Sequence, residues 1–446
     1  MEKVKNILNA FTTANVPVVL VGGSIRDMLL NRDSVDIDLA TPLSPTEVKV
    51  AIENQPWCKS VIPTGIEHGT VTVVMTDGTI LEVTQYRVDI QCDGRHAEVL
   101  PTSRLTEDLA RRDLTINAIA WDGKSFTDPF GGKDDIKDRV LRCVGDPAKR
   151  FEEDYLRVIR TFRFEAKLGF KIEAKTLDAA LNSNIARKID IEGGNEEFPV
   201  KLERVIMEFD KVFGDSNADC EKFLHRMWDI GVIQVMLPEL NAGPLPCNEL
   251  TQSPEYHPEG DVWTHMAKVV NNVEGSDLVT ARWIAMLHDI AKPITAKIRK
   301  DPWYSYWKHD KVGASMIPTI GKRLKLPKRT IELATTCTRW HIYIYQAKPT
   351  SKNVRKVQVD VGKDNLRYLK QLAQADHMGR PVSQDVEAFV TPVAEELTPI
   401  LMGKHLVEKG HKPGPEFGNI LRNAHKHQLA TGEDNIDKLY KQAISM

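Results

Sequence analysis

The sequence predicts an α/β head followed by an elongated, all-helical body. Short apolar runs separated by turns fill the first 125 residues, a pattern typical of a small mixed sheet. From about residue 134 the apolar positions recur with helical spacing instead. Apolar residues make up 41% and charged residues 27% of the 446 positions, the composition of a globular chain long enough for several domains.

Composition also excludes several classes of protein. The 60 Lys and Arg nearly balance the 62 Asp and Glu, which excludes a polybasic, histone-like protein but leaves room for a local basic patch on nucleic acid. The most apolar stretch near the N-terminus, residues 16–23, has the length of a strand, so we expect neither a signal peptide nor a membrane span. The six Cys lie far apart without a CxxC pair, which favours a reducing cytoplasm over a disulfide framework or a zinc ribbon.

The elements of the head follow from its apolar runs. An apolar strand over residues 16–23 ends in a glycine turn, and a short helix follows over residues 24–31. Further strands are predicted over residues 35–40, 68–78 and 79–88, with Asp77-Gly78 as the hairpin turn between the last two.

Helices are predicted beyond the head. Residues 151–170, FEEDYLRVIRTFRFEAKLGF, have helical spacing and a plausible stop at Gly169. The proline-rich segment at residues 237–260 predicts a domain boundary. The predicted domains are a head over residues 1–133, a helical neck and body over 134–240, a domain rich in His and Asp over 255–380 and a helical tail over 381–446.

The first chemical pattern is a glycine pair. Gly22 and Gly23 lie between an apolar strand and a predicted helix that contains Arg26. Glycine lets the backbone approach a phosphate, and a helix N-terminus offers free N–H groups to it. A tight turn without a ligand explains the pair equally well.

The second pattern is a pair of carboxylates in a strand. Asp36 and Asp38 alternate with apolar residues in VDIDLA, so both side chains lie on one face with Cα atoms about 6.5–7 Å apart. Such a pair fits two Mg²⁺ ions in an in-line phosphoryl transfer. A solvated edge strand is the alternative for an isolated DxD, but the glycine pair upstream favours the metal site. Glu82 on a later strand is either a third carboxylate or a solvent-facing residue.

A third pattern is RRDLTINAIA at residues 111–120. Arg111, Arg112 and Asp113 are predicted at the start of a helix that contains Asn117, with Asp113 near its N-cap. Arginine donates bidentately to phosphate oxygens, so the pattern suits a triphosphate. A surface Arg-Asp helix start is the alternative.

A fourth pattern places Asp154, Arg157, Arg160 and Arg163 three residues apart, on one side of a continuous helix. Such a row is usually a solvated helix face, on which Glu153 would pair with Arg157. The functional interpretation is an edge that reads nucleobases. A carboxylate accepts and a guanidinium donates, so Asp154 and Arg157 together match cytosine and adenine and reject uracil and guanine without a nucleic-acid template.

Taken together, GGSIRD, DID, EVTQYR, RRDLTINA, DPFGG and EDYLRVIRTFRF resemble the class II tRNA nucleotidyltransferases, the CCA-adding enzymes of the polymerase β superfamily. The resemblance is dense over residues 16–240 and implies a polymerase-β-like nucleotidyltransferase head. It implies that Asp36 and Asp38 bind catalytic Mg²⁺, and that Asp154 and Arg157 form an amino-acid template for ATP and CTP. The implied nucleotide-binding residues are Gly22, Gly23, Arg26, Arg111, Arg112, Asp113, Asn117, Asp154, Arg157, Arg160 and Arg163.

Residues 86–110 correspond to the flexible loop of that family. Relatives that add only CC have a shortened loop, so the full length here favours complete CCA addition.

A second resemblance lies in the C-terminal half. His265, His288, Asp289 and Asp376 follow the H…HD…D pattern of the HD phosphohydrolase superfamily, with the adjacent His-Asp pair predicted on a helix. Such ligands suit Ni²⁺, Mn²⁺, Co²⁺ or Mg²⁺, and a metal held there would activate water against a phosphoester. The resemblance implies 2′,3′-cyclic phosphodiesterase, 2′-nucleotidase and phosphatase activity. The alternative is a relic site whose histidines only pack.

The sequence therefore predicts a cytoplasmic enzyme, monomeric or homodimeric and without a membrane partner, that builds the CCA end of tRNA from ATP and CTP. Two other hypotheses stay open: a poly(A) polymerase of the same fold, and an HD phosphohydrolase with an RNA-binding head. Two basic clusters, at residues 322–329 and 352–356, are either solvated helix ends or contacts to tRNA phosphates.

Overall fold

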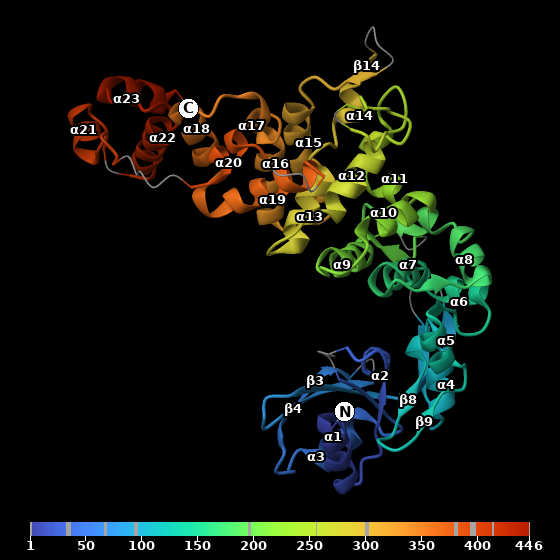
Figure 1. The fold of residues 1–446 in the computed structure, drawn as a ribbon. Coiled ribbons are helices and arrows are strands. Elements are labelled where there is room, and N and C mark those ends of the chain that lie inside the picture. Colours follow the sequence, from blue (N-terminus) through green and yellow to red (C-terminus); the bar gives the residue numbers. More distant parts are fainter. Residues whose placement is uncertain are drawn as a thin grey trace. The chain divides into compact units, whose positions relative to one another are not determined.

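The computed structural model describes residues 2–32, 37–66, 69–92, 97–194, 198–255, 257–298, 303–378, 382–392, 398–412 and 414–445. The chain forms two compact units (Figure 1). The first comprises Met1–Val212 and Asn217–Val232, and the second comprises Phe213–Ser216 and Ile233–Met446.

A mixed sheet forms the N-terminal part of the first unit. In spatial order the described strands are β3 (Cys58–Gly65), β4 (Thr70–Met75), β5 (Ile80–Gln85), β2 (Asp38–Thr41), β1 (Val19–Val21), β8 (Ala120–Trp121) and β9 (Phe126–Thr127). β2 pairs parallel with β5 and antiparallel with β1. The predicted hairpin between β4 and β5 is confirmed, with Gly78 at φ +84° in its turn.

Three helices accompany this sheet, namely α1 (Glu2–Thr13), α2 (Gly23–Leu29) and α3 (Pro45–Ile52). The apolar side of α1 and the buried residues of α3 share one core with the strands. Ser44 and Glu47 form a capping box at the start of α3, which fixes where that helix begins. The predicted α/β head is therefore confirmed.

The rest of the first unit is mostly helical. A two-stranded ribbon comes first, formed by β6 (Arg87–Cys92) and β7 (Ala97–Pro101). The helices and short strands that follow are α4 (Leu105–Ala110), η2 (Thr115–Asn117), α5 (Gly132–Asp138), β10 (Val140–Leu141), α6 (Pro147–Glu153), α7 (Leu156–Leu168), β11 (Lys171–Ile172), α8 (Ala174–Leu181), η3 (Ile185–Lys188), β12 (Ile189–Asp190), β13 (Val200–Lys201), α9 (Leu202–Phe213) and α10 (Cys220–Asp229).

Two helix predictions in this part are wrong. The predicted helix through residues 153–164 is broken, because Asp154 has extended backbone (φ −151°, ψ 102°) between α6 and α7. α7 does end at Gly169, as expected, in the left-handed conformation. Residues 111–113 do not begin a helix but follow the end of α4, and η2 is a single 3₁₀ turn.

The second unit is helical, as predicted, apart from one small ribbon. Its elements are α11 (Val232–Met236), η4 (Pro238–Asn241), α12 (Val262–Asn271), α13 (Leu278–Leu287), α14 (Lys292–Thr295), β14 (Lys297–Ile298), β15 (Tyr304–Ser305), α15 (His309–Arg323), α16 (Lys328–Trp340), α17 (Tyr343–Gln346), α18 (Ser351–Val361), η5 (Lys363–Asn365), α19 (Leu366–Asp376), α20 (Gln384–Val390), α21 (Gly403–Glu408), α22 (Pro415–Thr431) and α23 (Ile436–Ile444). The last three helices share a small core of their own.

The proline-rich segment at residues 237–260 belongs to the second unit. Leu240, Cys247 and Leu250 in this segment are buried. The division between the two units falls before this segment, between residues 212 and 233.

The chain enters the second unit twice. Residues 213–216 belong to the second unit, residues 217–232 to the first, and the chain then enters the second unit for the remainder. Arg282 of α13 is 2% exposed and contacts residues 213–216. Its Nη1 donates to the carbonyl oxygens of Phe213 and Asp215 at 2.9 and 2.8 Å.

Among the described residues, no helix combines the length and apolar character needed to span a bilayer. The five cysteines whose side chains are described form no disulfide with one another, and burial raises the pKa of four of them, Cys58, Cys143, Cys247 and Cys337.

Candidate functional site

The first candidate site surrounds Gly22, at the junction of β1 and α2. Gly22 has φ +73° and ψ −142°, a backbone conformation that favours glycine. A Cβ atom at this position would lie 3.2 Å from Nη1 of Arg112 and 3.4 Å from Oδ2 of Asp38. The structure thus brings three of the predicted site residues together around the N-terminus of α2. Asp36 lies outside the described residues.

Glu82 lies beside Asp38 in the sheet. The two residues are paired in register between the parallel strands β2 and β5. Paired residues point to the same face, so the half-buried Asp38 and the exposed Glu82 present two carboxylates side by side. Neighbouring carboxylates repel one another unless a cation lies between them.

Arg26 is buried, with 5% of its surface exposed, and contacts other side chains of the first unit. It pairs with Asp27 at 2.9 Å, and its Nη1 donates to Oδ1 of Asn117 at 2.8 Å. Its guanidinium also lies 5.0 Å from the ring centre of Phe164 on α7. A Cβ at Gly23 would come within 3.3 Å of Arg26. These contacts tie the start of α2 to η2 and α7.

Asp108 positions the two adjacent arginines and was missed by sequence reasoning. It is 1% exposed and pairs with Arg111 at 2.8 Å and with Arg112 at 3.2 Å. Burial alone would raise the pKa of Asp108, but the two guanidinium groups outweigh it and lower the pKa. The spacing of Asp108 three and four residues before Arg111 and Arg112 was the available signal.

Asp113 and Arg160 form a further ion pair. Oδ2 of Asp113 accepts from Nε and Nη2 of Arg160 at 2.9 and 2.7 Å. Oδ1 accepts from Nδ2 of Asn117 at 3.0 Å and from the backbone N–H of Leu114 at 2.8 Å. Burial raises the pKa of Asp113, but Arg160 and the hydrogen bonds hold it well below its usual range.

The predicted template residues do not contact one another through any described ion pair. Asp154 pairs with Arg204 of α9 at 2.9 Å. Arg157 pairs with Glu153 at 2.6 Å, as the i, i+4 alternative predicted. It also donates to the backbone oxygens of Arg150 and Arg111, each at 3.0 Å.

Arg163 faces the interior of the first unit. It is 8% exposed, pairs with Glu208 of α9 at 2.5 Å and lies 4.1 Å from the ring centre of Phe164. Glu208 is another residue that sequence reasoning missed, and no local pattern signals it because it lies 45 residues away.

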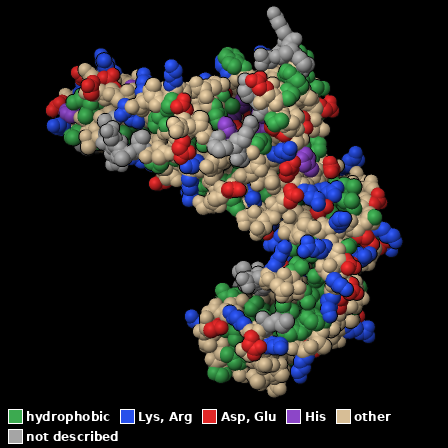
Figure 2. All heavy atoms as spheres, viewed as in Figure 1, with side chains coloured by type: hydrophobic (Ala, Val, Ile, Leu, Met, Phe, Trp, Pro, Cys, Tyr) green, Lys and Arg blue, Asp and Glu red, His purple; other side chains and the backbone are tan. Residues whose placement is uncertain are grey.

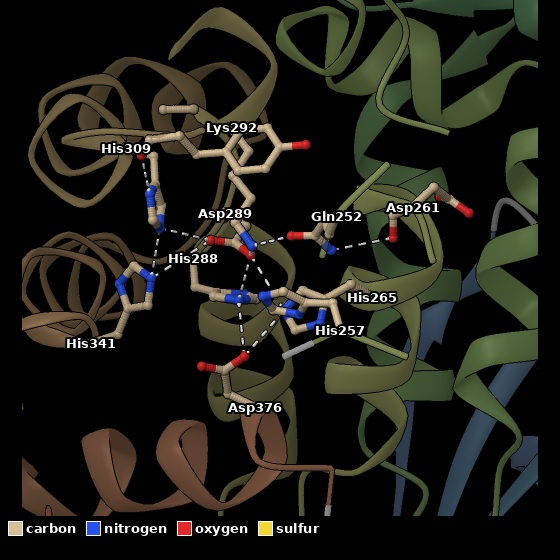
Figure 3. A network of polar contacts seen from close by, with 12 residues as sticks. Gln252, His257, Asp261, His265, His288, Asp289, Lys292, His309, His341 and Asp376 are labelled. Atoms are coloured by element: carbon tan, nitrogen blue, oxygen red, sulfur yellow. Dashed lines mark hydrogen bonds and ion pairs between the residues drawn. The ribbon is translucent and has the colours of Figure 1, made fainter. Parts of the chain in front are cut away.

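The second candidate site lies in the second unit, where helix ends bring histidines and carboxylates together (Figure 3). Nε2 of His265 on α12 lies 3.1 Å from Oδ1 of Asp376 and 3.4 Å from Oδ2 of Asp289. Nε2 of His288 lies 3.1 Å from the same Asp289 oxygen and 3.9 Å from Asp376. The four predicted ligands therefore converge. The prediction that the His-Asp pair lies on a helix is wrong, because α13 ends at Leu287 and the pair directly follows it.

The donor atoms of this cluster fit a divalent cation. Nε2 of His265, Nε2 of His288 and both carboxylate oxygens of Asp289 are buried and lack a well-aligned hydrogen bond, although they lie close to one another. Nδ1 of His288 lies 2.7 Å from the carbonyl oxygen of Ala285, and Nδ1 of His265 lies 2.6 Å from Glu259. A proton on each Nδ1 leaves an Nε2 lone pair for a metal, an orientation typical of metal-binding histidines.

The charges of the cluster are balanced by positive groups. Burial and the nearby Lys292 lower the pKa of His265, but the contacting carboxylates outweigh them and raise it to about 10. Burial raises the pKa of Asp289, yet His288, Lys292 and His265 hold it well below its usual range. Positive charge among these donors is therefore favoured, whether it comes from protons or from a metal ion.

Four further residues of the cluster were not among the predicted ligands: Glu259, Lys292, His309 and His341. Lys292 pairs with Oδ2 of Asp289 at 2.6 Å and donates to Gln252 at 2.7 Å. His309 and His341 approach the other oxygen, Oδ1, at 3.2 and 3.6 Å. The sequence shows both as histidines in the same helical domain, but no spacing rule connects them to the H…HD…D pattern.

Charged side chains are dispersed over the face seen in Figure 2, and histidine side chains are visible on the second unit. Within the first basic cluster, Arg323 pairs with Glu239 at 2.7 Å. Part of that cluster therefore stabilises the fold, while its lysines stay candidates for phosphate contacts.

Comparison with known proteins identifies the domain in which each candidate site lies. Residues 18–142 match the poly(A) polymerase head domain family, and residues 261–378 match the HD domain family. The chain is 30% identical to the multifunctional CCA protein of Pseudomonas paraeruginosa, over 91% of this chain and 95% of that protein. It is also 30% identical to the CCA-adding enzyme of Limosilactobacillus fermentum, over 97% and 93%.

Solved structures show the same fold. A CCA-adding enzyme of Bacillus stearothermophilus in complex with CTP superposes with a TM-score of 0.67 at 22% identity, covering 100% of this chain and 96% of that one. The matched head and HD domains imply dependence on divalent metal ions. The hypotheses of a poly(A) polymerase and of an HD phosphohydrolase with an RNA-binding head are not favoured. With relatives that span nearly its whole length, the chain belongs to the family of CCA-adding enzymes.

Proposed function

We propose that this enzyme adds or repairs the 3′-terminal CCA of tRNA, using CTP and ATP and releasing pyrophosphate. The observation that carries the proposal is the convergence of Asp38 and Arg112 on Gly22 at the start of α2. A glycine without a Cβ, a carboxylate and a guanidinium together suit a metal-bound triphosphate.

Each group in the head has a separate task in this reaction. Asp38, with Asp36 from the predicted motif, would hold Mg²⁺, and Glu82 lies in register to support the same charge. Bound Mg²⁺ supplies neutralisation of the triphosphate and activation of the attacking 3′-hydroxyl. Arg112 donates to phosphate oxygens, since only part of its hydrogen-bonding capacity is used by Asp108 and the carbonyl oxygen of Asn117.

Nucleobase selection is proposed for Asp154 and Arg157. The carboxylate of Asp154 accepts from Arg204 and from the N–H of Leu156 and retains further lone pairs for an amino group of cytosine or adenine. Arg157 donates mainly to its own chain, so pairing with a base requires it to exchange one of those contacts. Arg160 and Arg163 are proposed to position this edge, through Asp113 and Glu208 respectively, rather than to bind phosphate directly.

The solved relatives support the substrates. They include CCA-adding enzymes in complex with CTP and with ATP, and an enzyme of Thermotoga maritima complexed with tRNA_CCA. By this analogy tRNA, CTP and ATP are the partners of the first unit, and the reaction belongs in the cytoplasm, where tRNA is processed. A monomer or a homodimer is expected.

For the second unit we propose hydrolysis of phosphoesters such as 2′,3′-cyclic nucleotides and 2′-phosphates. His265, His288, Asp289 and Asp376 would hold a divalent ion, with Ni²⁺, Mn²⁺, Co²⁺ and Mg²⁺ as the candidates. Such an ion supplies a water of lowered pKa as nucleophile.

The proposed domain division is 1–133, 134–240, 255–380 and 381–446.

The test uses tRNA that ends at the residue before CCA, or after C or CC, with labelled CTP and ATP. Addition that stops at CCA supports the proposal, whereas continued AMP addition would indicate a poly(A) polymerase. The variant Asp38→Asn should reduce addition by at least about 100-fold. Asp77→Asn, in the exposed turn between β4 and β5, is the matched control and should keep full activity.

A further inference from the structure

The turn that leads into α15 carries an exposed tryptophan. Trp307 is 74% exposed, and no other Phe, Tyr or Trp side chain among the described residues is exposed; the rest are buried or half-buried. A single apolar residue on a protein surface needs no function to explain it. The surroundings of Trp307 therefore decide whether its exposure has a role.

Trp307 and Lys308 occupy the two middle positions of this turn. The backbone N–H of His309 donates to the carbonyl oxygen of Tyr306 at 3.2 Å, which closes the turn. Lys308 has a φ of +64°, in the left-handed region that residues other than glycine seldom adopt. Such a conformation costs free energy and persists only where the surrounding structure holds it. The tip of the turn is therefore a defined feature of the surface.

Both ends of the turn are anchored beside the cluster of histidines and carboxylates. The ammonium group of Lys292, which pairs with Asp289, lies 5.6 Å from the centre of the Tyr306 ring. At the other end, Nε2 of His309 lies 3.2 Å from Oδ1 of Asp289 (Figure 3). Two peptide units separate His309 from Trp307, so their Cα atoms are at most about 8 Å apart. Trp307 therefore lies next to the proposed hydrolytic site.

Lys308 covers one face of the indole. Its ammonium group lies 3.9 Å from the centre of the Trp307 ring, within the range of cation–π attraction. This contact restrains the ring, while its exposure leaves room at the other face. An indole held in this way can stack on a flat aromatic group with little further loss of side-chain entropy. Lys308 also adds positive charge, which attracts a phosphate-bearing ligand.

The occupant that fits these features is the base of a nucleotide. Every nucleobase has a π face that stacks on an aromatic side chain, whatever its hydrogen-bonding edge. In a nucleoside 2′-phosphate or 2′,3′-cyclic phosphate, the base and the 2′-oxygen are attached to adjacent carbons of the ribose. A phosphate held at the cluster therefore keeps its base close by, at the distance of a residue that neighbours the cluster in the chain.

We propose that the indole of Trp307 is a stacking platform for the nucleobase of the substrate, and that it selects nucleotides over phosphoesters without a base. This inference rests on the proposed hydrolysis by the second unit and deepens it by naming the group that recognises the substrate. In that reaction water attacks phosphorus, the bond from phosphorus to the 2′-oxygen breaks, and this oxygen takes up a proton. Trp307 determines specificity, whereas bond cleavage remains with the cluster.

The experiment compares two phosphate esters of secondary alcohols in the full-length protein. Adenosine 2′-phosphate carries a base and glycerol 2-phosphate does not, and both release inorganic phosphate, which is measured after chelation and addition of Ni²⁺, Mn²⁺, Co²⁺ or Mg²⁺. Trp307→Ala should raise KM for adenosine 2′-phosphate by about 10-fold without changing kcat, and kcat/KM for glycerol 2-phosphate should be unchanged. Trp307→Phe should restore part of the affinity. Val407→Ala, at a residue of α21 that is 55% exposed, is the control and should keep the wild-type constants.

Binding is measured separately, so that this result does not depend on turnover. The protein is labelled with 5-fluorotryptophan, and the ¹⁹F resonance that is missing from Trp307→Phe identifies Trp307. Adenosine 2′-phosphate should shift this resonance, and glycerol 2-phosphate should not. Lys308→Gly suits the positive φ and preserves the turn, but it removes the cation, so adenosine 2′-phosphate should bind about 2–5-fold more weakly.

The other outcomes separate this inference from the proposed function. Equal losses for both substrates in Trp307→Ala would indicate a general effect on the fold and overturn the platform, and so would an unchanged KM without a ¹⁹F shift. If the wild type hydrolyses neither substrate with any of the four ions, the proposed hydrolysis is overturned. The ¹⁹F resonance then decides the platform alone: a shift with adenosine 2′-phosphate supports it, and the absence of a shift overturns it as well.

Discussion

Arg160 of α7 donates hydrogen bonds from two of its nitrogens to a single oxygen of Asp113, at 2.9 and 2.7 Å. The other oxygen of Asp113 accepts from Asn117, and Asn117 in turn accepts from Arg26. This line of polar contacts connects α7 with η2 and with the start of α2. It places the sequence patterns around residues 26, 113 and 160 in one network, although they lie far apart along the chain.

We expect Arg160→Ala to destabilise the protein by about 1–3 kcal/mol, because it leaves the buried Asp113 carboxylate without its cation. The free energy of unfolding in urea measures this loss. Arg187→Ala, at an exposed arginine of η3, is the control and should change stability by less than about 0.5 kcal/mol. Equal effects of the two substitutions would contradict a structural role for the Asp113–Arg160 pair.

The same pair predicts a dependence on pH. The pKa of Asp113 is lowered in the folded protein, so its ionised form stabilises the fold at pH values above its unfolded pKa of about 3.9. The stability advantage of the wild type over Asp113→Asn should be complete at neutral pH. It should shrink as the pH falls below about 5. An advantage that grows on acidification would show that Asp113 is not held ionised.

Gly22→Ala should impair nucleotide addition more than it impairs folding. The substitution imposes backbone strain of about 1–3 kcal/mol and crowds Asp38 and Arg112. Gly78→Ala is the matched control, because Gly78 also has positive φ but nothing lies within 4 Å of its added Cβ. Both variants should lose similar stability in thermal unfolding, and only Gly22→Ala should lower kcat for CTP incorporation beyond what that loss explains.

Arg204 should affect nucleotide choice through Asp154. Arg204→Ala removes the ion pair that orients the Asp154 carboxylate, so discrimination against UTP and GTP should weaken by about 1–3 kcal/mol. Asp154→Ala should have the same effect or a larger one. Competition between CTP and UTP on a tRNA lacking CCA measures the change. If discrimination is unchanged in both variants, Asp154 has a structural role only.

The HD cluster should be separable from CCA addition. His288→Ala removes a ligand, and hydrolysis of 2′,3′-cyclic nucleotides should fall by at least about 10–100-fold while CCA addition persists. The control His427→Ala should retain both activities. Added Ni²⁺, Mn²⁺, Co²⁺ or Mg²⁺ after chelation identifies the working metal. Unchanged hydrolysis in His288→Ala would remove this histidine from the proposed ligand set.

The alternation and turn patterns predicted the head well because they are local. The hairpin at Asp77-Gly78 and the glycine turn before α2 each depend on a few adjacent residues, and both were confirmed. The break at Asp154 escaped prediction for a related reason. Asp154 and Tyr155 interrupt an apolar pattern that is helical on both sides, and the ion pair with Arg204 is formed 50 residues away.

The residues of the candidate sites likewise fall into those that a sequence pattern marks and those that only the fold brings together. His265, His288, Asp289 and Asp376 could be chosen because a family pattern joins them, whereas no pattern marked His309 and His341. Similarly, arginines at residues 157 and 163 suggested ligand binding from their spacing alone. The structure pairs them with Glu153 and Glu208, and the second of these contacts depends on tertiary packing that spacing does not encode.

The path of the chain through its two units limits how the protein can be divided. A fragment that begins at residue 233 carries the buried Arg282 but lacks Phe213 and Asp215, whose carbonyl oxygens accept from it. Losing two hydrogen bonds to a buried cation costs on the order of 3 kcal/mol or more. A gene fusion or recombination event that transfers the HD domain with a single crossover at residue 233 is therefore disfavoured. Exchange of the two units between relatives should keep residues 213–216 with the second unit.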